Sequence, residues 1–419
     1  ASVANAILTV EDGHRFDVGG SLTVGSADSG QEYGESRVTN PRGVLVEGVG
    51  VHVGGLLTVG QAYNSGTSPA DEGVAIVESA SVEQEGGSAS LEGGMAVGRS
   101  TSGRAGGAVA SASLLLDGTS LTGSGAWTIG EAVVPSSRYE GNALVSSADV
   151  RILGDGTSRV DLTSVVVGHA QSSGEGSARV TAANLTYSGG TFNSSNGLVV
   201  GSADVGVAAS PVQATGSATF LDTNASVRLL QIGRYTGVGE QNPSSFAHGS
   251  LTLADSILTV DEDAEFALLT GGVGTATSEL SLTRSVLDIE GDLLLGDGSE
   301  LLFDIDGYDE YGRIEACSAS LDGDLAVTFS FSLTDVDYWD LITLDVGSVF
   351  VGDFDSTEVL GLSDGMDWSL GFATNDCGQA VYRLAVTGVP VDPVAVPAPG
   401  AVCMLSVGLG LLSLRRRRG

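Results

Sequence analysis

Apolar positions in this chain fall in short alternating runs that end in glycine. Leu22 and Val24 flank a threonine just before Gly25, and similar runs precede six later glycines. Short runs rich in Val, Leu and Thr, bounded by Gly and Ser, are typical of β-strands. No sustained helical period occurs before residue 400. The pattern therefore predicts an all-β protein. The glycines that close the runs are Gly25, Gly60, Gly98, Gly130, Gly168, Gly201 and Gly233.

These glycines recur every 32 to 38 residues, and weaker copies of the run end at Gly271 and Gly296. A fixed period of this size indicates a repeat protein, in which each unit buries its apolar edge against its neighbours. Each unit reads as a loop followed by short strands separated by polar corners, which describes one coil of a parallel β-solenoid. We expect about eight to nine right-handed coils stacked about 4.8 Å apart. The glycines should form one column, because glycine lets the chain turn from a strand into the loop.

Composition divides the chain into three parts. Residues 1–296 form the repeat array. Residues 297–390 are richer in Asp and aromatic residues, and form either a β cap of the solenoid or a small separate β domain. Residues 391–419 begin with a Pro/Val linker, continue with an apolar run at 400–414 that we expect to be a short helix, and close with arginines at 415–418. The apolar run is shorter than the roughly 20 residues that span a bilayer comfortably.

The charge of the chain is strongly acidic. It carries 52 Asp and Glu against 18 basic residues, all of them Arg, for a formal net charge of −34. Nucleic-acid binding needs a basic surface, so we expect no nucleic-acid partner. An acidic surface keeps an extended protein soluble and repels other polyanions.

Candidate catalytic groups are sparse in this sequence. The four histidines, His14, His52, His169 and His248, are far apart, and His169 and His248 are expected in loops. No Ser-His-Asp or Cys-His grouping is predicted, so no catalytic residue or cofactor is assigned. Among the aromatic residues, Trp127 is expected in the core, whereas three tyrosines near the loop side could stack on sugars. These are Tyr63, Tyr139 and Tyr235.

Two further hypotheses concern the C-terminal segment. Asp304, Asp306 and Asp309 offer oxygen ligands around a glycine turn and are a calcium candidate, although no glutamate completes an EF-hand and a plain Asp-Gly turn is the alternative. Cys317 and Cys377 lie in one segment, and a disulfide between them is expected if the chain is exported. The alternative is two free thiols.

The C-terminus resembles a PEP-CTERM sorting signal. Its three parts are the entry Val396, Pro397, Ala398 and Pro399, the apolar run, and the cluster Arg415, Arg416, Arg417 and Arg418. Ala398 stands where the family most often has Glu. The pieces YGRIEA, WDLITLDVGSVFVGDFD and AVYRLAVTGVP, in that order, also resemble the ends of autotransporter-like β-helical proteins. The resemblance implies export, a transient inner-membrane tether through the C-terminus, processing by an exosortase-type enzyme, and release to the cell surface or extracellular matrix.

The resemblance implies no particular activity. We therefore expect a non-enzymatic structural or surface protein of the bacterial envelope or extracellular matrix. The alternatives are a carbohydrate-binding or carbohydrate-active β-helix protein, with extracellular polysaccharide as a partner, and an adhesin that uses the loop side of the solenoid.

Overall fold

A computed structural model describes most of the chain up to residue 387. The described ranges are 2–4, 7–10, 15–29, 35–45, 48–64, 73–103, 106–135, 140–154, 156–206, 210–238, 242–333, 337–362 and 365–387. All the regular secondary structure within these ranges is β-strand. The all-β prediction is therefore confirmed for the described part of the chain.

The strands follow one another with short connections. The first two coils contain β1 (Ser2–Ala4), β2 (Ile7–Val10), β3 (Arg15–Val18), β4 (Leu22–Ser29), β5 (Glu35–Thr39), β6 (Arg42–Leu45), β7 (Gly50–Val53) and β8 (Leu57–Asn64). The central coils contain β9 (Val74–Glu85), β10 (Ser88–Leu91), β11 (Met95–Ser102), β12 (Gly107–Asp117), β13 (Ser120–Gly123), β14 (Ala126–Val134), β15 (Asn142–Leu153), β16 (Arg159–Leu162), β17 (Ser164–Ser172), β18 (Ala178–Ser194), β19 (Leu198–Val205), β20 (Val212–Val227) and β21 (Leu230–Gly237). The remaining strands are β22 (Phe246–Ala254), β23 (Ile257–Val260), β24 (Ala264–Phe266), β25 (Leu269–Thr270), β26 (Thr275–Thr283), β27 (Val286–Leu295), β28 (Ser299–Ile305), β29 (Arg313–Leu321), β30 (Asp324–Phe329), β31 (Asp337–Val346), β32 (Phe350–Gly352), β33 (Ser356–Leu360), β34 (Asp367–Thr374) and β35 (Gln379–Thr387).

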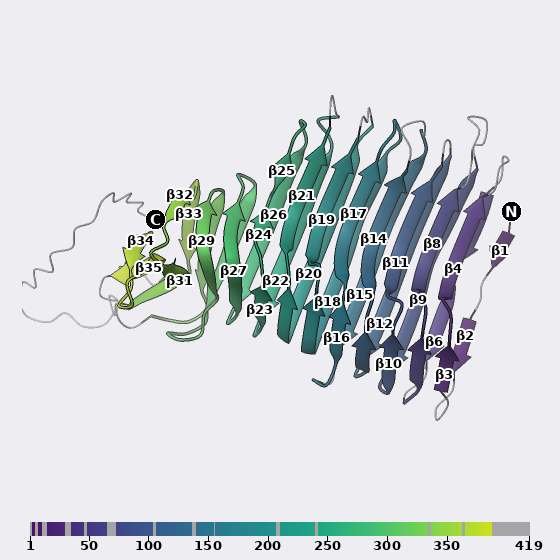
Figure 1. Ribbon diagram of the computed structural model, residues 1–419, viewed down its shortest axis with the longest axis horizontal. Coiled ribbons are helices and arrows are strands. Elements are labelled where there is room, and N and C mark those ends of the chain that lie inside the picture. The colour runs from purple at the N-terminus through teal and green to yellow at the C-terminus, as the bar shows by residue number, and fades with distance from the viewer. Residues whose placement is uncertain are drawn as a thin grey trace, which may run out of the picture.

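The strands stack as a parallel β-solenoid of about nine turns. Within the array, strands pair in parallel with the equivalent strands one coil earlier and one coil later. Met95 of β11, for example, pairs with Leu57 of β8 on one side and Trp127 of β14 on the other. Figure 1 shows the resulting row of strands, with the first coil at one end and β31, β34 and β35 at the other.

The seven glycines line up in a single column, as predicted. Val59 pairs with both Val24 and Val97, and Gln61 pairs with both Ser26 and Arg99, which places Gly60 between Gly25 and Gly98. The same register continues to Gly233. The next position of this glycine column is Ala267, because Phe266 pairs with Ile232. The assignment of a repeat copy to Gly271 is therefore wrong, and Gly296 takes the position after Ala267.

Contrary to the expectation from the sequence, the glycine column does not serve to turn the chain from a strand into a loop. The glycines lie inside strands, with φ between 66° and 76°, rather than at the exit to a loop. A Cβ at Gly60 would lie 2.6 Å from the Cβ of Ala112 on the opposite sheet, and a Cβ at Gly201 would lie 1.9 Å from the carbonyl oxygen of His248. Glycine is needed because the opposite sheet lies so close to this column that a Cβ would clash with it.

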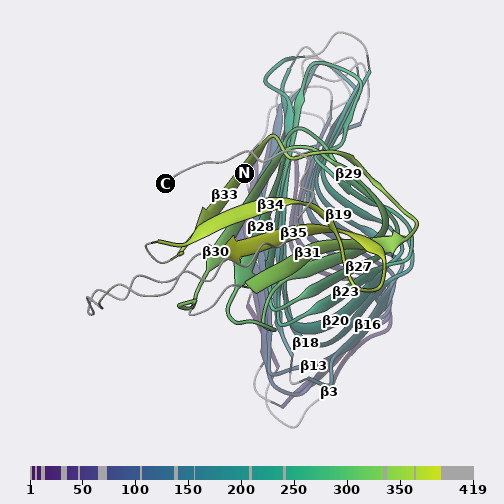
Figure 2. The ribbon, with the colours of Figure 1, turned by 90° about the vertical axis from the view of Figure 1, so that its left-hand side faces the viewer.

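The column marks where the cross-section narrows. Figure 2, which looks along the rod, shows a wide lobe and a narrow lobe that carries the loops. Two residues after the glycine, five coils place a buried alanine between the sheets of the narrow lobe: Ala27, Ala62, Ala132, Ala170 and Ala203. A sixth coil has Ser100 there, whose buried hydroxyl donates to the Ala108 carbonyl and accepts from the Leu144 N–H of the facing sheet. Four large buried side chains of the central coils contact one another edge to face or tilted: Trp127, Tyr187, Phe192 and Phe220.

One corner of the wide lobe is held by the same backbone geometry in successive coils. Gly189, Asp222, Asp255 and Arg284 occupy equivalent positions, and all four have positive φ. The residue after the corner is a buried Ser or Thr in three of these coils. Ser256 shows its role, because its hydroxyl donates to the Ala254 carbonyl and accepts from the N–H of Thr223. These hydroxyls satisfy backbone groups that the bend would otherwise leave buried and unpaired.

The parallel ladder crosses residue 296 without a break. β28 pairs with β26 and β30, and β30 pairs with β33, so coils continue to Leu360. β34 and β35 then form an antiparallel hairpin, and β35 pairs antiparallel with β31. Trp339 of β31 is buried in this region. Of the two alternatives for 297–390, the register favours continued coils closed by a cap over a separate domain.

Residues 388–419 lie outside the described residues, and they include the linker and predicted sorting signal at 391–419. The expected helix at 400–414 and the arginines at 415–418 therefore lie outside them too. Among the described residues, no helix has the length and hydrophobicity needed to cross a membrane.

Candidate binding groove

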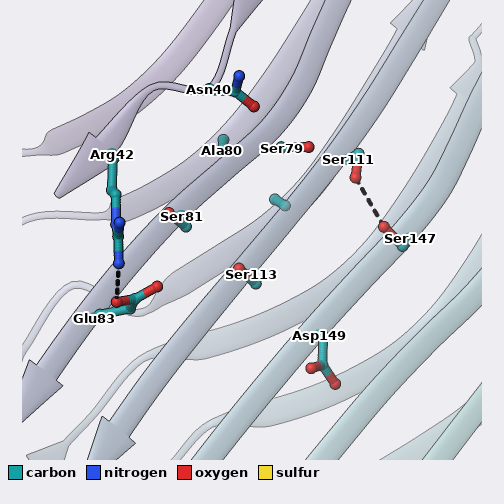
Figure 3. A pocket seen from close by; sticks show the side chains of 11 residues that line it. Asn40, Arg42, Ser79, Ala80, Ser81, Glu83, Ser111, Ser113, Ser147 and Asp149 are labelled. Carbon is teal, nitrogen blue, oxygen red and sulfur yellow. Dashed lines mark hydrogen bonds and ion pairs between the residues drawn. The ribbon is translucent and has the colours of Figure 1, made fainter. Parts of the chain in front are cut away.

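A polar groove of about 470 Å³ crosses the outer face of four successive coils. Figure 3 shows side chains from the β5–β6 junction and from β9, β12 and β15 facing it. The lining residues are Asn40, Arg42, Ser79, Ala80, Ser81, Glu83, Ser111, Ala112, Ser113, Ser147 and Asp149.

The groove is built from two rows of side chains that follow the stack of coils. One row is Arg42, Ser81, Ser113 and Asp149, which pair in register from coil to coil. The other row lies beside the bend that precedes them and contains Asn40, Ser79, Ser111 and Ser147. The Ser111 and Ser147 hydroxyls are 2.8 Å apart and share a hydrogen bond.

Backbone geometry explains why this face is hollow. Asn40 and Ser79 have φ of 49° and 54°, values that bend each strand at the groove. Behind them, Ala80 and Ala112 pack against the glycine column, where a larger side chain would not fit. The bend and the narrow core beneath it therefore bring a row of short polar side chains to the bottom of a depression.

The charges at the groove compensate one another. Arg42 forms an ion pair with Glu83 at one end. At the other end Asp149 accepts a hydrogen bond from Nε of Arg151 at 3.0 Å. Two arginines and two carboxylates therefore cancel, although the chain as a whole carries −34. Hydroxyl, amide and paired charged groups equip the groove to donate and accept hydrogen bonds to a polar ligand.

The calcium hypothesis for Asp304, Asp306 and Asp309 is not supported by their contacts. Asp306 forms an ion pair with Arg284, and a carboxylate oxygen of Asp304 accepts a hydrogen bond from the Thr283 hydroxyl. These three residues do not form a cluster of carboxylates in the described structure. The guanidinium of Arg284 already neutralises the carboxylate of Asp306.

A different carboxylate cluster does occur among the described residues. Asp297, Asp322 and Asp355 each place an oxygen within 4.8 Å of the others. The neighbouring charge of Asp322 is the main cause that raises the pKa of Asp355. Acidic groups near the surface often lie close together without a metal ion, so the cluster alone does not define a metal site.

The predicted disulfide is absent, since both cysteines are free thiols. Cys317 of β29 donates to the Glu290 carbonyl at 2.8 Å and to Asp345 at 3.2 Å. This hydrogen bond to a carboxylate raises the pKa of the Cys317 thiol. Cys377 lies in the turn between β34 and β35 and is exposed.

The histidine prediction needs two corrections. His169 and His248 lie in strands β17 and β22, not in loops. The register also brings together a serine, a histidine and an aspartate, since His169 Nδ1 is 2.8 Å from Ser202 Oγ and His169 Nε2 is 4.0 Å from Asp204. Ser202 is only 3% exposed, and 4.0 Å exceeds hydrogen-bond length, so this grouping lacks the accessible nucleophile and oriented base of a hydrolase. His52 lies on β7, and His14 falls outside the described residues.

The aromatic candidates divide between core and surface. Trp127 is fully buried, as predicted, but so is Tyr235, which therefore cannot stack on a sugar. Tyr63 is 42% exposed on β8, and Tyr139 lies outside the described residues.

The groove residues were not identified from the sequence. Short stretches of Ser and Ala are typical of turns or strand edges. The sequence around each stretch does not show that they lie side by side in the fold. The one available signal was the recurrence of an outward serine in successive repeats, at Ser81 and Ser113. The comparisons with known proteins do not assign the groove either, because the sequence matches no protein-family model and no curated protein.

Proposed function

We propose that this protein is an exported, non-enzymatic structural component of the bacterial cell surface or extracellular matrix. Its C-terminal signal would tether it briefly to the inner membrane, until an exosortase-type enzyme processes it. The observation that carries the proposal is the parallel ladder that continues from β1 to β33, which makes the described part of the chain a rod.

Three features support this function. The described residues form a rod that repeats one coil, and each added coil extends its length and surface area. Its charge of −34 favours solubility outside the cell. The tail has the proline entry, apolar run and arginine cluster of the PEP-CTERM sorting signals that it resembles.

Surface labelling of whole cells tests the proposal. For this test the chain would be expressed with an N-terminal export signal in a Gram-negative-type bacterium that has an exosortase. We expect an antibody against the solenoid to label intact cells or the extracellular matrix. Replacing Arg415 to Arg418 with Ser should reduce labelling and leave the protein in the membrane or periplasm. Equal labelling of both forms would contradict sorting by the tail, and labelling only after cell lysis would contradict the surface function.

A second candidate function, carbohydrate binding, is favoured by the polar groove. Sugars present hydroxyl groups at regular intervals, and the groove presents hydroxyl, amide and charged groups on successive coils. Retention of the purified solenoid by immobilised polysaccharide would support this function, and no retention by any polysaccharide would reject it.

A further inference from the structure

The groove at Asn40 to Asp149 has the dimensions of a ligand site. Its volume of about 470 Å³ falls among those typical of ligand-binding clefts. Four coils separated by about 4.8 Å give it a length of about 14 Å along the rod. A linear ligand aligned with the solenoid axis would meet an equivalent pair of side chains at each coil.

The chemistry of the lining defines the ligand class. Five serine hydroxyls and the Asn40 amide provide hydrogen-bond donors and acceptors. No aromatic residue is among the lining residues, so binding would depend on hydrogen bonds and not on stacking. The charged groups, Arg42 with Glu83 and Asp149 with Arg151, already neutralise each other.

The charge of the whole chain excludes one class of polymer. A net charge of −34 repels polyanions such as uronic-acid polysaccharides before they reach a site whose own charges cancel. A polycation would be attracted to the acidic surface generally and not to this groove. The class of ligand that remains is an uncharged polymer rich in hydroxyl groups.

We propose that the groove binds a segment of a neutral polysaccharide, with the sugar chain lying along the solenoid axis over Ser81, Ser113 and Ser147. This inference deepens the carbohydrate-binding function and rests on it. Hydrogen bonding to solvated hydroxyls is individually weak, so we expect dissociation constants on the order of 1 mM for a short oligosaccharide. Several rods on one polymer would bind more tightly through multivalency.

Affinity electrophoresis in native gels tests the proposal. The gels would contain dextran, a soluble mixed-linkage β-glucan or galactomannan as neutral probes, and alginate or polygalacturonate as acidic probes. The protein's negative charge drives it through the gel, and binding to the embedded polymer slows it. We expect at least one neutral polymer to retard the wild-type protein and neither acidic polymer to do so.

Tryptophan substitutions that fill the groove provide the site-specific comparison. Ser113→Trp and Ser81→Trp should each abolish the retardation, equivalent to at least a tenfold loss of affinity. Ser217→Trp is the matched control, since Ser217 occupies the same outward row two coils beyond Asp149 but outside the groove. None of these changes alters the net charge, so mobility without polymer should be unchanged. Circular dichroism would confirm that each variant keeps its β-structure, and either groove variant suffices for the comparison.

Each outcome decides a different claim. No retardation by any polymer would overturn both carbohydrate binding and the groove. Retardation that all three variants retain would leave carbohydrate binding intact and overturn the groove as its site. Retardation by acidic polymers alone would overturn the ligand class.

Discussion

Gly201 lies where β19 approaches the backbone of β22 most closely. Its φ is 66°, and a Cβ there would lie 1.9 Å from the carbonyl oxygen of His248. The obstacle is backbone, which cannot rotate away as a long side chain could. The same residue thus supplies both the backbone conformation and the space that the narrow part of the core requires.

Substitution of this glycine should be severely destabilising. We expect Gly201→Ala to lower the free energy of unfolding by about 3 kcal/mol or more, because it combines a positive-φ penalty with a steric clash. Thermal unfolding followed by circular dichroism measures the effect. Gly20→Ala is the control, since a Cβ there meets nothing within 4 Å. Equal melting temperatures for the two variants would contradict the close approach of the sheets.

The corner ion pair between Asp255 and Arg284 gives the stability a pH dependence. The hydrogen bond from Arg284 is the main cause that lowers the pKa of Asp255 below its ordinary value of 3.8. The folded pKa is depressed, so the stabilisation is present above the unfolded pKa and is lost as the pH falls through the folded value.

Asp255→Asn isolates this contribution. At pH 7 we expect the variant to melt about 1–2 °C below the wild type, a small difference because the pair is exposed and solvent-screened. The gap should narrow as the pH is lowered from 3.8 through the folded pKa of Asp255. A gap that stays constant across this range would show that the charge of Asp255 has no part in it. Asp261→Asn, at a neighbouring acidic position, serves as the control.

At the scale of the element, one coil is the unit of the structure. Val167 pairs with Val200, so the residues between them complete one circuit. Removal of residues 168–200 would join Val167 to Gly201 and restore the run of apolar residues ending in glycine. Stability in a repeat array depends mainly on contacts between neighbours, so the shorter array should still fold.

The deletion is therefore expected to keep the β circular dichroism spectrum and to lower the melting temperature only slightly. A matched deletion of residues 168–184 removes about half a coil and puts the following strands out of register. That variant should lose most of its β-structure or aggregate. If both deletions behave alike, coils are not the unit of stability.

The elements differ in how far the sequence predicts them. The strands follow from alternation within a single repeat, and the glycine column follows from the spacing between successive repeats. Ala267 was missed because alanine rarely adopts its φ of 51°, so only the register reveals its equivalence to the glycines. The groove was missed because it depends on which serines of four coils share a row, and loops of different length hide that register in the sequence.

At the scale of the whole molecule, the coils make a rod that is closed at its C-terminal end. The antiparallel pairing of β31, β34 and β35 turns across the parallel stack (Figure 2). A cap of this kind limits edge-to-edge association, to which unpaired strands are prone. The predicted sorting signal follows this cap in the sequence after the linker, so processing there would release the rod without cutting a coil.

The central claim is that the mature protein leaves the membrane by losing its tail. Its apolar run would measure about 22 Å as a helix, against a bilayer core of about 30 Å, so it suits a transient tether. Mass spectrometry of the protein from the extracellular fraction tests this most directly. We predict a C-terminus close to Pro397, with no peptide containing Arg415 to Arg418. Extracellular protein that ends in an intact Gly419 would contradict the account.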